Sequence, residues 1–157
     1  MNKNGLGLHI VFTGAPGCGK GTQARILKEK VAIPHLSTGE MLRAEAAKPT
    51  TLGREIKELL DAGSFVTDEM IIEMVSGRID EDDCKNGFIL DGYQRSIEQV
   101  YLYDSLIERL NIDFGIVIFL NPPYEEIKKR IVGRVICPNC KEIFNEQIDF
   151  LKPQVDG

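Results

Sequence analysis

The feature that most constrains this chain is its glycine-rich segment GAPGCGK, at positions 14–20. The apolar, β-branched residues 8–12 just before it predict a buried parallel strand. Apolar residues at helical spacing continue to Val31 and predict a helix that begins near Lys20. The segment matches the start of the pattern G-x-x-x-x-G-K-[ST], in the strand-to-helix context that this pattern requires. We therefore predict a loop whose backbone N–H groups and lysine bind phosphate, rather than a glycine-rich turn that only connects two elements.

The residue after the lysine departs from this pattern. Gly21 stands where the pattern has Ser or Thr, and the hydroxyl comes one position later, at Thr22. In most enzymes with such a loop that hydroxyl holds Mg²⁺ directly. The chain therefore does not look like a GTPase or a motor ATPase.

Strand and helix patterns alternate along much of the chain. Residues 88–90 are predicted to be a further buried strand and residues 114–120 a strand. Residues 97–110 and 124–132 are predicted to be helices. This alternation predicts an α/β fold, a P-loop NTPase-type open parallel sheet with helices on both faces and right-handed crossovers.

Residues 37–80 contain one helical pattern after another and no strand pattern. Ser37 and Glu40 fit a capping box at the start of one helix, and Thr67 opens another. The inner face of this last helix is predicted to consist of Ile71, Met74, Val75 and Ile79. We interpret the stretch as a helical insertion. The predicted division is residues 1–36 and 81–134 for the core, 37–80 for the insertion and 135–157 for a segment without a clear period.

Charge and composition narrow the classes of partner. The 157-residue chain has a net charge of -5, which argues against a general electrostatic hold on nucleic acid. No apolar run approaches the ~20 residues needed to span a bilayer, and no secretory signal is evident. We therefore expect no membrane association and a cytoplasmic location. The four cysteines do not have the pattern of a disulfide framework.

Several motifs in chain order resemble the adenylate kinase family. They are GAPGCGKGTQ at 14–23, STGEMLR at 37–43, AGSFVTD at 62–68, GFILDG at 87–92 and RIVGR at 130–134. The resemblance implies a nucleoside monophosphate kinase that transfers phosphate reversibly from MgATP to AMP and gives two ADP. It also implies that the partners are ATP, AMP and ADP and that the chain acts as a monomer. In this family Mg²⁺ is held largely by phosphates and water, which accounts for Gly21.

The resemblance assigns roles to residues at the matching positions. The catalytic set is Lys20, Asp91, Arg95, Arg130 and Arg134. The ATP site comprises Gly17, Cys18, Gly19, Lys20, Gly21, Thr22, Arg130, Arg134, Ile143 and Phe144. The AMP site comprises Thr38, Arg43, Ser64, Phe65, Val66, Gly92, Tyr93, Gln94, Arg95 and Gln99. The cations would bind phosphates, and Asp91 would orient the water shell of the metal. Thr38, Val66 and Gln99 favour AMP over the alternative acceptors UMP and CMP.

Each of these residues also has a plainer interpretation. Arg43 or Arg130, taken alone on a helix, would more often be a solvated surface charge than a ligand. Asp91 would serve only to end a strand, and Thr38 only to start a helix. Gln99 would be an ordinary exposed glutamine.

Two positions near the predicted site depart from the family pattern. Gln94 stands where the family has a proline that tends to follow a cis peptide bond. The peptide bond before Gln94 is therefore expected to be either trans or strained. Either outcome changes the direction in which the Arg95 side chain points. Val135 stands where the family usually has a second arginine beside Arg134, which removes one positive charge near the donor.

The last segment contains one cysteine pair of a zinc-type lid. Cys137 and Cys140 have zinc-knuckle spacing, but a structural zinc site needs four ligands. Zn²⁺ is expected only if the other half of the site lies beyond Gly157, and two free thiols are the alternative. We expect the chain to be cut off inside its lid and the segment after Val135 to be poorly ordered. Kinase activity would then be weak or absent. A truncated protein that binds nucleotides without transferring phosphate is the alternative function.

Overall fold

The centre of the molecule is a four-stranded sheet in the order β2-β3-β1-β4. The computed structural model describes residues 7–113, 115–139 and 143–148. The strands are β1 (Leu8–Thr13), β2 (His35–Ser37), β3 (Gly87–Asp91) and β4 (Ile116–Phe119). All three pairings between neighbouring strands are parallel. The predicted open parallel sheet is confirmed.

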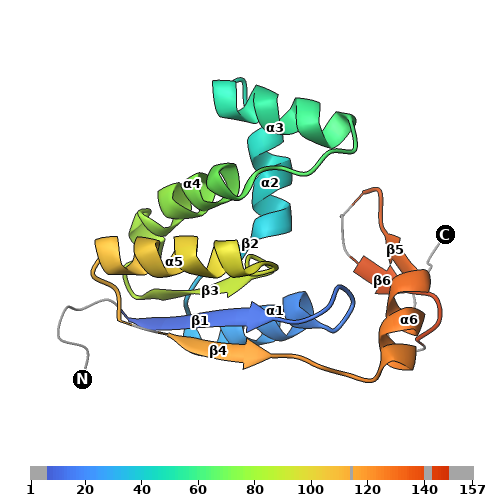
Figure 1. Ribbon diagram of the computed structural model, residues 1–157. Coiled ribbons are helices and arrows are strands. Elements are labelled where there is room, and N and C mark those ends of the chain that lie inside the picture. The colour runs from blue at the N-terminus through green and yellow to red at the C-terminus, as the bar shows by residue number, and fades with distance from the viewer. Residues whose placement is uncertain (1–6, 114, 140–142, 149–157) are drawn as a thin grey trace.

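Helices cover both faces of this sheet (Figure 1). Helix α1 (Lys20–Val31) packs on one face, where Ile10 of β1 belongs to an apolar cluster. Helices α4 (Asp68–Ile79) and α5 (Ile97–Arg109) pack on the other face, where Val11 belongs to a second cluster. Successive side chains of a strand point to opposite faces, so neighbouring residues of β1 supply both cores.

Helices follow one another between β2 and β3, as the sequence predicts. Helices α2 (Thr38–Ala46) and α3 (Thr51–Asp61) stand away from the sheet, and α4 leads back to it (Figure 1). Thr67 caps α4, because its hydroxyl accepts a hydrogen bond from the backbone N–H of Met70. The predicted inner face of α4 is buried at Met74, Val75 and Ile79.

The start of α2 differs from the predicted capping box. Ser37 occupies the N-cap position, but its side chain accepts no capping hydrogen bond. The next hydroxyl, that of Thr38, is buried and donates to the backbone oxygen of Asp91 at 3.2 Å. The helix therefore begins where the sequence predicts, and it is tied to the end of β3 instead of being capped by its own side chains.

A helix and a hairpin follow the sheet and lie beyond the carboxyl ends of its strands (Figure 1). The helix is α6 (Tyr124–Val132), as predicted. Strands β5 (Arg134–Ile136) and β6 (Ile143–Asn145) form an antiparallel pair. The expectation of a poorly ordered segment after Val135 is therefore wrong for these strands. Three-residue strands are too short to show a period in the sequence.

Side-chain and backbone hydrogen bonds attach this hairpin to α6. The Asn145 amide donates to the backbone oxygen of Arg130 at 3.0 Å, and Asn145 is buried. The backbone N–H of Glu146 donates to the oxygen of Gly133 at 2.8 Å. These bonds connect β6 to the last turn of the helix.

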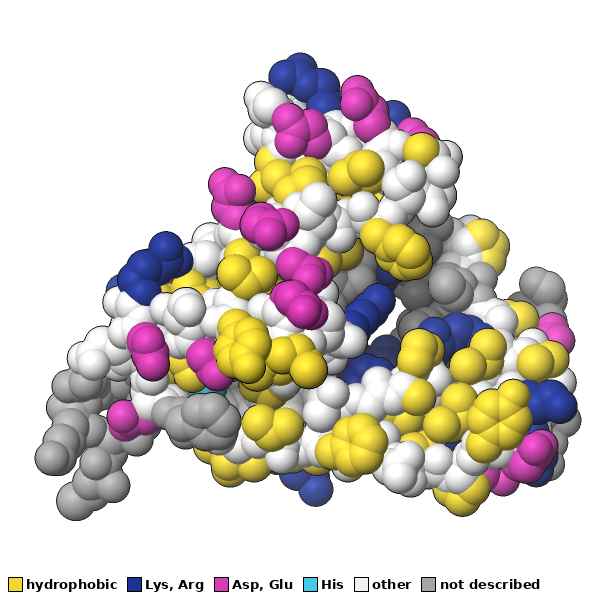
Figure 2. All heavy atoms as spheres, viewed as in Figure 1, with side chains coloured by type: hydrophobic (Ala, Val, Ile, Leu, Met, Phe, Trp, Pro, Cys, Tyr) yellow, Lys and Arg dark blue, Asp and Glu magenta, His cyan; other side chains and the backbone are white. Residues whose placement is uncertain are grey.

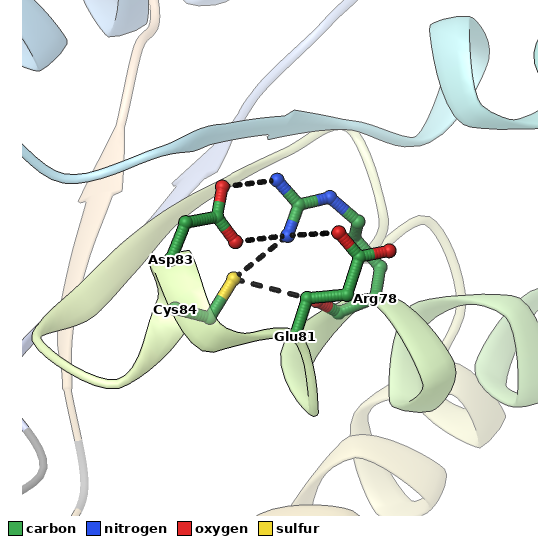
Figure 3. A network of polar contacts seen from close by, with 4 residues as sticks. All are labelled: Arg78, Glu81, Asp83 and Cys84. Carbon is green, nitrogen blue, oxygen red and sulfur yellow. Dashed lines mark hydrogen bonds and ion pairs between the residues drawn. The ribbon is translucent and has the colours of Figure 1, made fainter.

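An ion-pair network connects the end of α4 to the segment just before β3 (Figure 3). The Arg78 guanidinium donates to both carboxylate oxygens of Asp83 at 2.7 Å. Its Nη1 lies 3.0 Å from Cys84 Sγ and 3.4 Å from a Glu81 carboxylate oxygen. Burial raises the pKa of Cys84 to about 11, so this cysteine is a neutral core thiol at physiological pH.

Strand β4 forms one edge of the sheet and is exposed. The strand predicted here is confirmed, and Ile116 is 53% and Phe119 65% exposed. Among the described residues, β4 pairs with β1 alone. No helix within the described residues combines the length and the apolar character needed to cross a membrane.

The buried His9 makes stability depend on pH. Its side chain packs against Phe88, and its Nε2 has no hydrogen-bond partner among the described residues. Burial lowers the pKa of His9 below 6.5, although Asp113 partly opposes this effect.

We expect the free energy of unfolding to fall as the pH drops below 6.5, because the unfolded chain then binds a proton that folded His9 rejects. Urea unfolding at about pH 7.5 and about pH 5.5 measures this effect. His9→Phe should lose the part of the pH dependence that comes from this site. Equal pH dependence in parent and variant would contradict the prediction.

Candidate active site

The loop between β1 and α1 has the backbone geometry of an anion cradle. Gly14, Gly17 and Gly19 have φ angles of 136°, 81° and 106°, a region that side-chain-bearing residues rarely adopt. Gly19 is the N-cap of α1, and no side chain caps this helix. The first N–H groups of the helix therefore face the loop with their partial positive charge.

Lys20 is folded over this loop. Its Nζ donates to the backbone oxygens of Gly14 at 2.8 Å and Ala15 at 3.0 Å, and it lies 3.7 Å from Cys18 Sγ. The ammonium group is thus held above the cradle by neutral acceptors. A phosphate group would offer it charged oxygens, which make stronger hydrogen bonds than backbone carbonyls do.

Arg130 brings α6 to the same loop. Its Nη1 donates to the backbone oxygen of Cys18 at 3.0 Å. The approach is close, because a Cβ on Gly17 would lie 2.8 Å from Cγ1 of Ile131. Figure 2 shows Lys and Arg side chains in the hollow between the α2–α3 lobe and α6.

Asp91 ends β3 and faces the start of α1. Its carboxylate is buried, and Oδ2 lies 3.4 Å from the position that a Cβ of Gly21 would take. The missing side chain at position 21 leaves room for this carboxylate.

His35 is a neighbour of Asp91 that the sequence analysis missed. Its Nε2 lies 3.2 Å from Asp91 Oδ2, and both side chains are about nine-tenths buried. An ionised carboxylate only accepts hydrogen bonds, so Nε2 carries the proton in this pair. The signal that could have found His35 is its place on a parallel strand, since the carboxyl ends of parallel strands meet at one edge of the sheet.

Three predicted acceptor-site residues gather around the turn after β3. Thr38 donates to the Asp91 backbone oxygen, and its Oγ1 lies 3.4 Å from the position of a Cβ on Gly92. Gly92 has a φ of 80°, which a side chain would strain. Nε of Arg95 donates to the Gly92 oxygen at 3.1 Å, and the side chain is exposed. Thr38, Gly92 and Arg95 therefore lie next to Asp91.

The other two residues of this turn have different surroundings. The ring of Tyr93 is 1% exposed and packs against Tyr103, so this side chain is part of the core and is not available to a ligand. Its hydroxyl has no partner among the described residues, and burial raises its pKa. No peptide bond in the described part of the chain is cis, so the bond before Gln94 is trans.

Gln99 is buried and already bonded to protein groups. Its Oε1 accepts from the backbone N–H of Arg95 at 2.8 Å, and its Nε2 donates to Asp68 at 2.6 Å. Its plainer interpretation as an exposed glutamine is wrong, because the side chain is 6% exposed. The sequence pointed to no site role for Asp68, which belongs to the motif at 62–68, or for its neighbour Ser96.

The remaining predicted residues lie farther out on the molecule. Arg43 is exposed on α2, and Ser64, Phe65 and Val66 lie between α3 and α4, with Phe65 95% exposed. Their inclusion in a site stays a prediction.

The predicted lid residues lie on the hairpin. Arg134 is exposed on β5, Phe144 pairs with Val135, and Ile143 lies on β6. Cys137 follows β5, whereas Cys140 lies outside the described residues. Within the residues that the structure describes, no group of three or more His, Cys, Asp or Glu side chains could hold a metal.

Removing the His35 donor should destabilise the fold. We expect His35→Ala to lower the free energy of unfolding by about 1–3 kcal/mol, because a buried carboxylate oxygen of Asp91 loses its partner. The control is His35→Gln, whose amide can still donate and which should lose less. Urea unfolding of both variants at one pH measures the difference, and equal losses would contradict this account.

The comparisons with known proteins agree with this geometry. The family model described as adenylate kinase matches residues 12–156. Proteins named adenylate kinase from Thermodesulfovibrio yellowstonii and Archaeoglobus fulgidus are 42% and 44% identical over 96% of this chain, and the matches cover 69% and 68% of those proteins. One from Thermosipho africanus is 43% identical, with 69% of its length covered. The chain belongs to the adenylate kinase family of phosphotransferases, which act on nucleotides.

Proposed function

We propose that this chain transfers a phosphoryl group reversibly between MgATP and AMP, with two ADP as the product. The observation that carries the proposal is the meeting of three elements at one glycine-rich loop. Lys20 comes from α1, Arg130 from α6 and Asp91 from the end of β3. Two cations and one carboxylate at a helix N-terminus suit a nucleotide phosphate that carries a metal ion.

The donor phosphates would lie in the loop formed by residues 17–22. Their negative charge would be met by the N–H groups of the α1 N-terminus, by Lys20 and by Arg130. Arg134 would add a further cation from β5. Phosphoryl transfer requires little covalent chemistry from the protein, so these groups act by aligning the donor and stabilising charge in the transition state.

Asp91 fits the role of orienting a hydrated Mg²⁺. Mg²⁺ prefers oxygen ligands, keeps several of its waters and is commonly bound through one or two carboxylates plus substrate phosphates. A single carboxylate beside the phosphate loop matches that donor set. When bound, the ion would neutralise charge on the phosphate oxygens, and His35 would keep the carboxylate of Asp91 in place.

The acceptor would bind on the side of Asp91 opposite to the phosphate loop. Arg95 would meet its phosphate, Thr38 and Gly92 would border the nucleoside, and Gln99 would meet its base. Val66 and the exposed Arg43, Ser64 and Phe65 would approach from the insertion. The identity of Thr38, Val66 and Gln99 supports AMP over UMP or CMP.

Three further assignments stay predictions from the sequence. They are a Zn²⁺ ion at Cys137 and Cys140, a cytoplasmic location and action as a monomer.

The test of this proposal is the dependence of ADP formation on Lys20. We expect Lys20→Ala to lower the rate of ADP formation from MgATP and AMP by about 10²- to 10³-fold, because one charge donor to the transition state is lost. The matched control is Lys30→Ala, which removes an exposed lysine from the last turn of the same helix. Chromatography of the nucleotides, with the three proteins purified in parallel, measures the rates. Equal rates in parent and Lys20→Ala would overturn the proposal.

A further inference from the structure

A partly buried hydrogen-bond network connects the first turn of α4 with the chain just before α5. Gln99 Nε2 donates to Asp68 Oδ1 at 2.6 Å, and Gln99 Oε1 accepts from the backbone N–H of Arg95 at 2.8 Å. The Ser96 hydroxyl donates to the second oxygen of Asp68 at 3.4 Å and accepts from the backbone N–H of Gln99 at 3.1 Å. The carboxamide of Gln99 is therefore held from two sides.

The two partners allow only one orientation of this carboxamide. A carboxylate only accepts hydrogen bonds, and a backbone N–H only donates them. Rotating the Gln99 amide by half a turn would set its NH₂ group against the Arg95 N–H and its oxygen against the Asp68 carboxylate. Both bonds would be lost and replaced by repulsive contacts. Asp68 supplies one of the two constraints, through a charge-assisted bond of the stronger kind.

An oriented carboxamide distinguishes two kinds of purine edge. Each of its polar atoms has one bond to the described residues and capacity for one more. Adenine presents an amino donor beside a ring-nitrogen acceptor, whereas a 6-oxopurine presents an oxygen acceptor beside a ring N–H donor. These patterns are reversed, so a carboxamide that pairs with one must rotate to pair with the other.

We propose that Asp68 is a specificity-determining positioning residue, which fixes the Gln99 carboxamide in the orientation that pairs with a 6-aminopurine. The inference rests on the proposed function, in which Gln99 meets the base of the acceptor. Gln99 is 6% exposed, so a mismatched base would leave polar groups unpaired beside a buried side chain. Asp68 touches no substrate in this account and acts through Gln99.

The experiment compares the binding of AMP and of IMP, its 6-oxo counterpart, by titration calorimetry. We expect Asp68→Ala to reduce the preference for AMP over IMP by about tenfold, because rotating Gln99 then breaks one hydrogen bond instead of two. The matched control is Glu69→Ala, which removes an exposed carboxylate from the same helical turn and should leave the preference unchanged. Equal preference ratios in the two variants would overturn the role of Asp68.

Two more variants separate orientation from a structural effect. Asp68→Asn keeps the size and polarity of the side chain, but its amide can donate to a rotated Gln99 as well as accept from the present one, so it should lose the preference as Asp68→Ala does. In a Gln99→Ala background, Asp68→Ala should change the preference no further, since the two residues act as one unit. An Asp68→Asn variant that keeps the preference of the parent, or additive effects in the double variant, would contradict the proposal. Thermal melts of Asp68→Ala and Glu69→Ala compare the stability of these two variants.

The same measurements distinguish this inference from the proposed function. In one outcome, the parent prefers AMP, Gln99→Ala loses this preference and Asp68→Ala keeps it. This outcome overturns only the role of Asp68 and leaves the proposed acceptor site standing. A parent without any preference, or one whose AMP affinity is unchanged in Gln99→Ala, overturns the acceptor site together with the role of Asp68.

Discussion

The parallel pairing of β1 with β3 is the constraint on which the site depends. Its register sets Phe12 opposite Asp91, so β3 ends beside the loop that follows β1. The pairing of β2 with β3 sets Ser37 opposite Asp91 and brings the start of α2 to the same edge. A slip by one residue would exchange the two faces of a strand, turn the carboxylate of Asp91 away from Gly21 and expose apolar side chains to water. Core packing and site geometry are therefore specified by the same register.

The parts of the site that follow from local sequence are those formed by consecutive residues. The phosphate loop needs glycines where φ is positive and a lysine at the helix start, and these are visible in residues 14–20. The bond between His35 and Asp91 was not predictable in this way, because it joins residues 56 positions apart and depends on strand order. The β5–β6 pair was missed for a different reason, since its strands are too short to show alternation.

A residue can belong to a family motif while its side chain is already engaged by other parts of the protein. Tyr93 lies in the predicted acceptor motif, yet its ring is part of the hydrophobic core. Gln99 lies in the same region, and its amide is already engaged by Arg95 and Asp68. A family motif identifies a position, whereas the neighbouring polar groups decide which atoms of that residue are available to a ligand.

The contact between the phosphate loop and α6 also couples two positions in evolution. Glycine at position 17 is constrained twice, by its φ of 81° and by the 2.8 Å that would separate a Cβ from Ile131 Cγ1. A smaller residue at position 131 would relieve the steric conflict but not the backbone strain. Variation in related genes should therefore be asymmetric: position 131 can change its apolar side chain while glycine at 17 is retained. A replacement at 17 requires both a smaller neighbour and a reshaped loop.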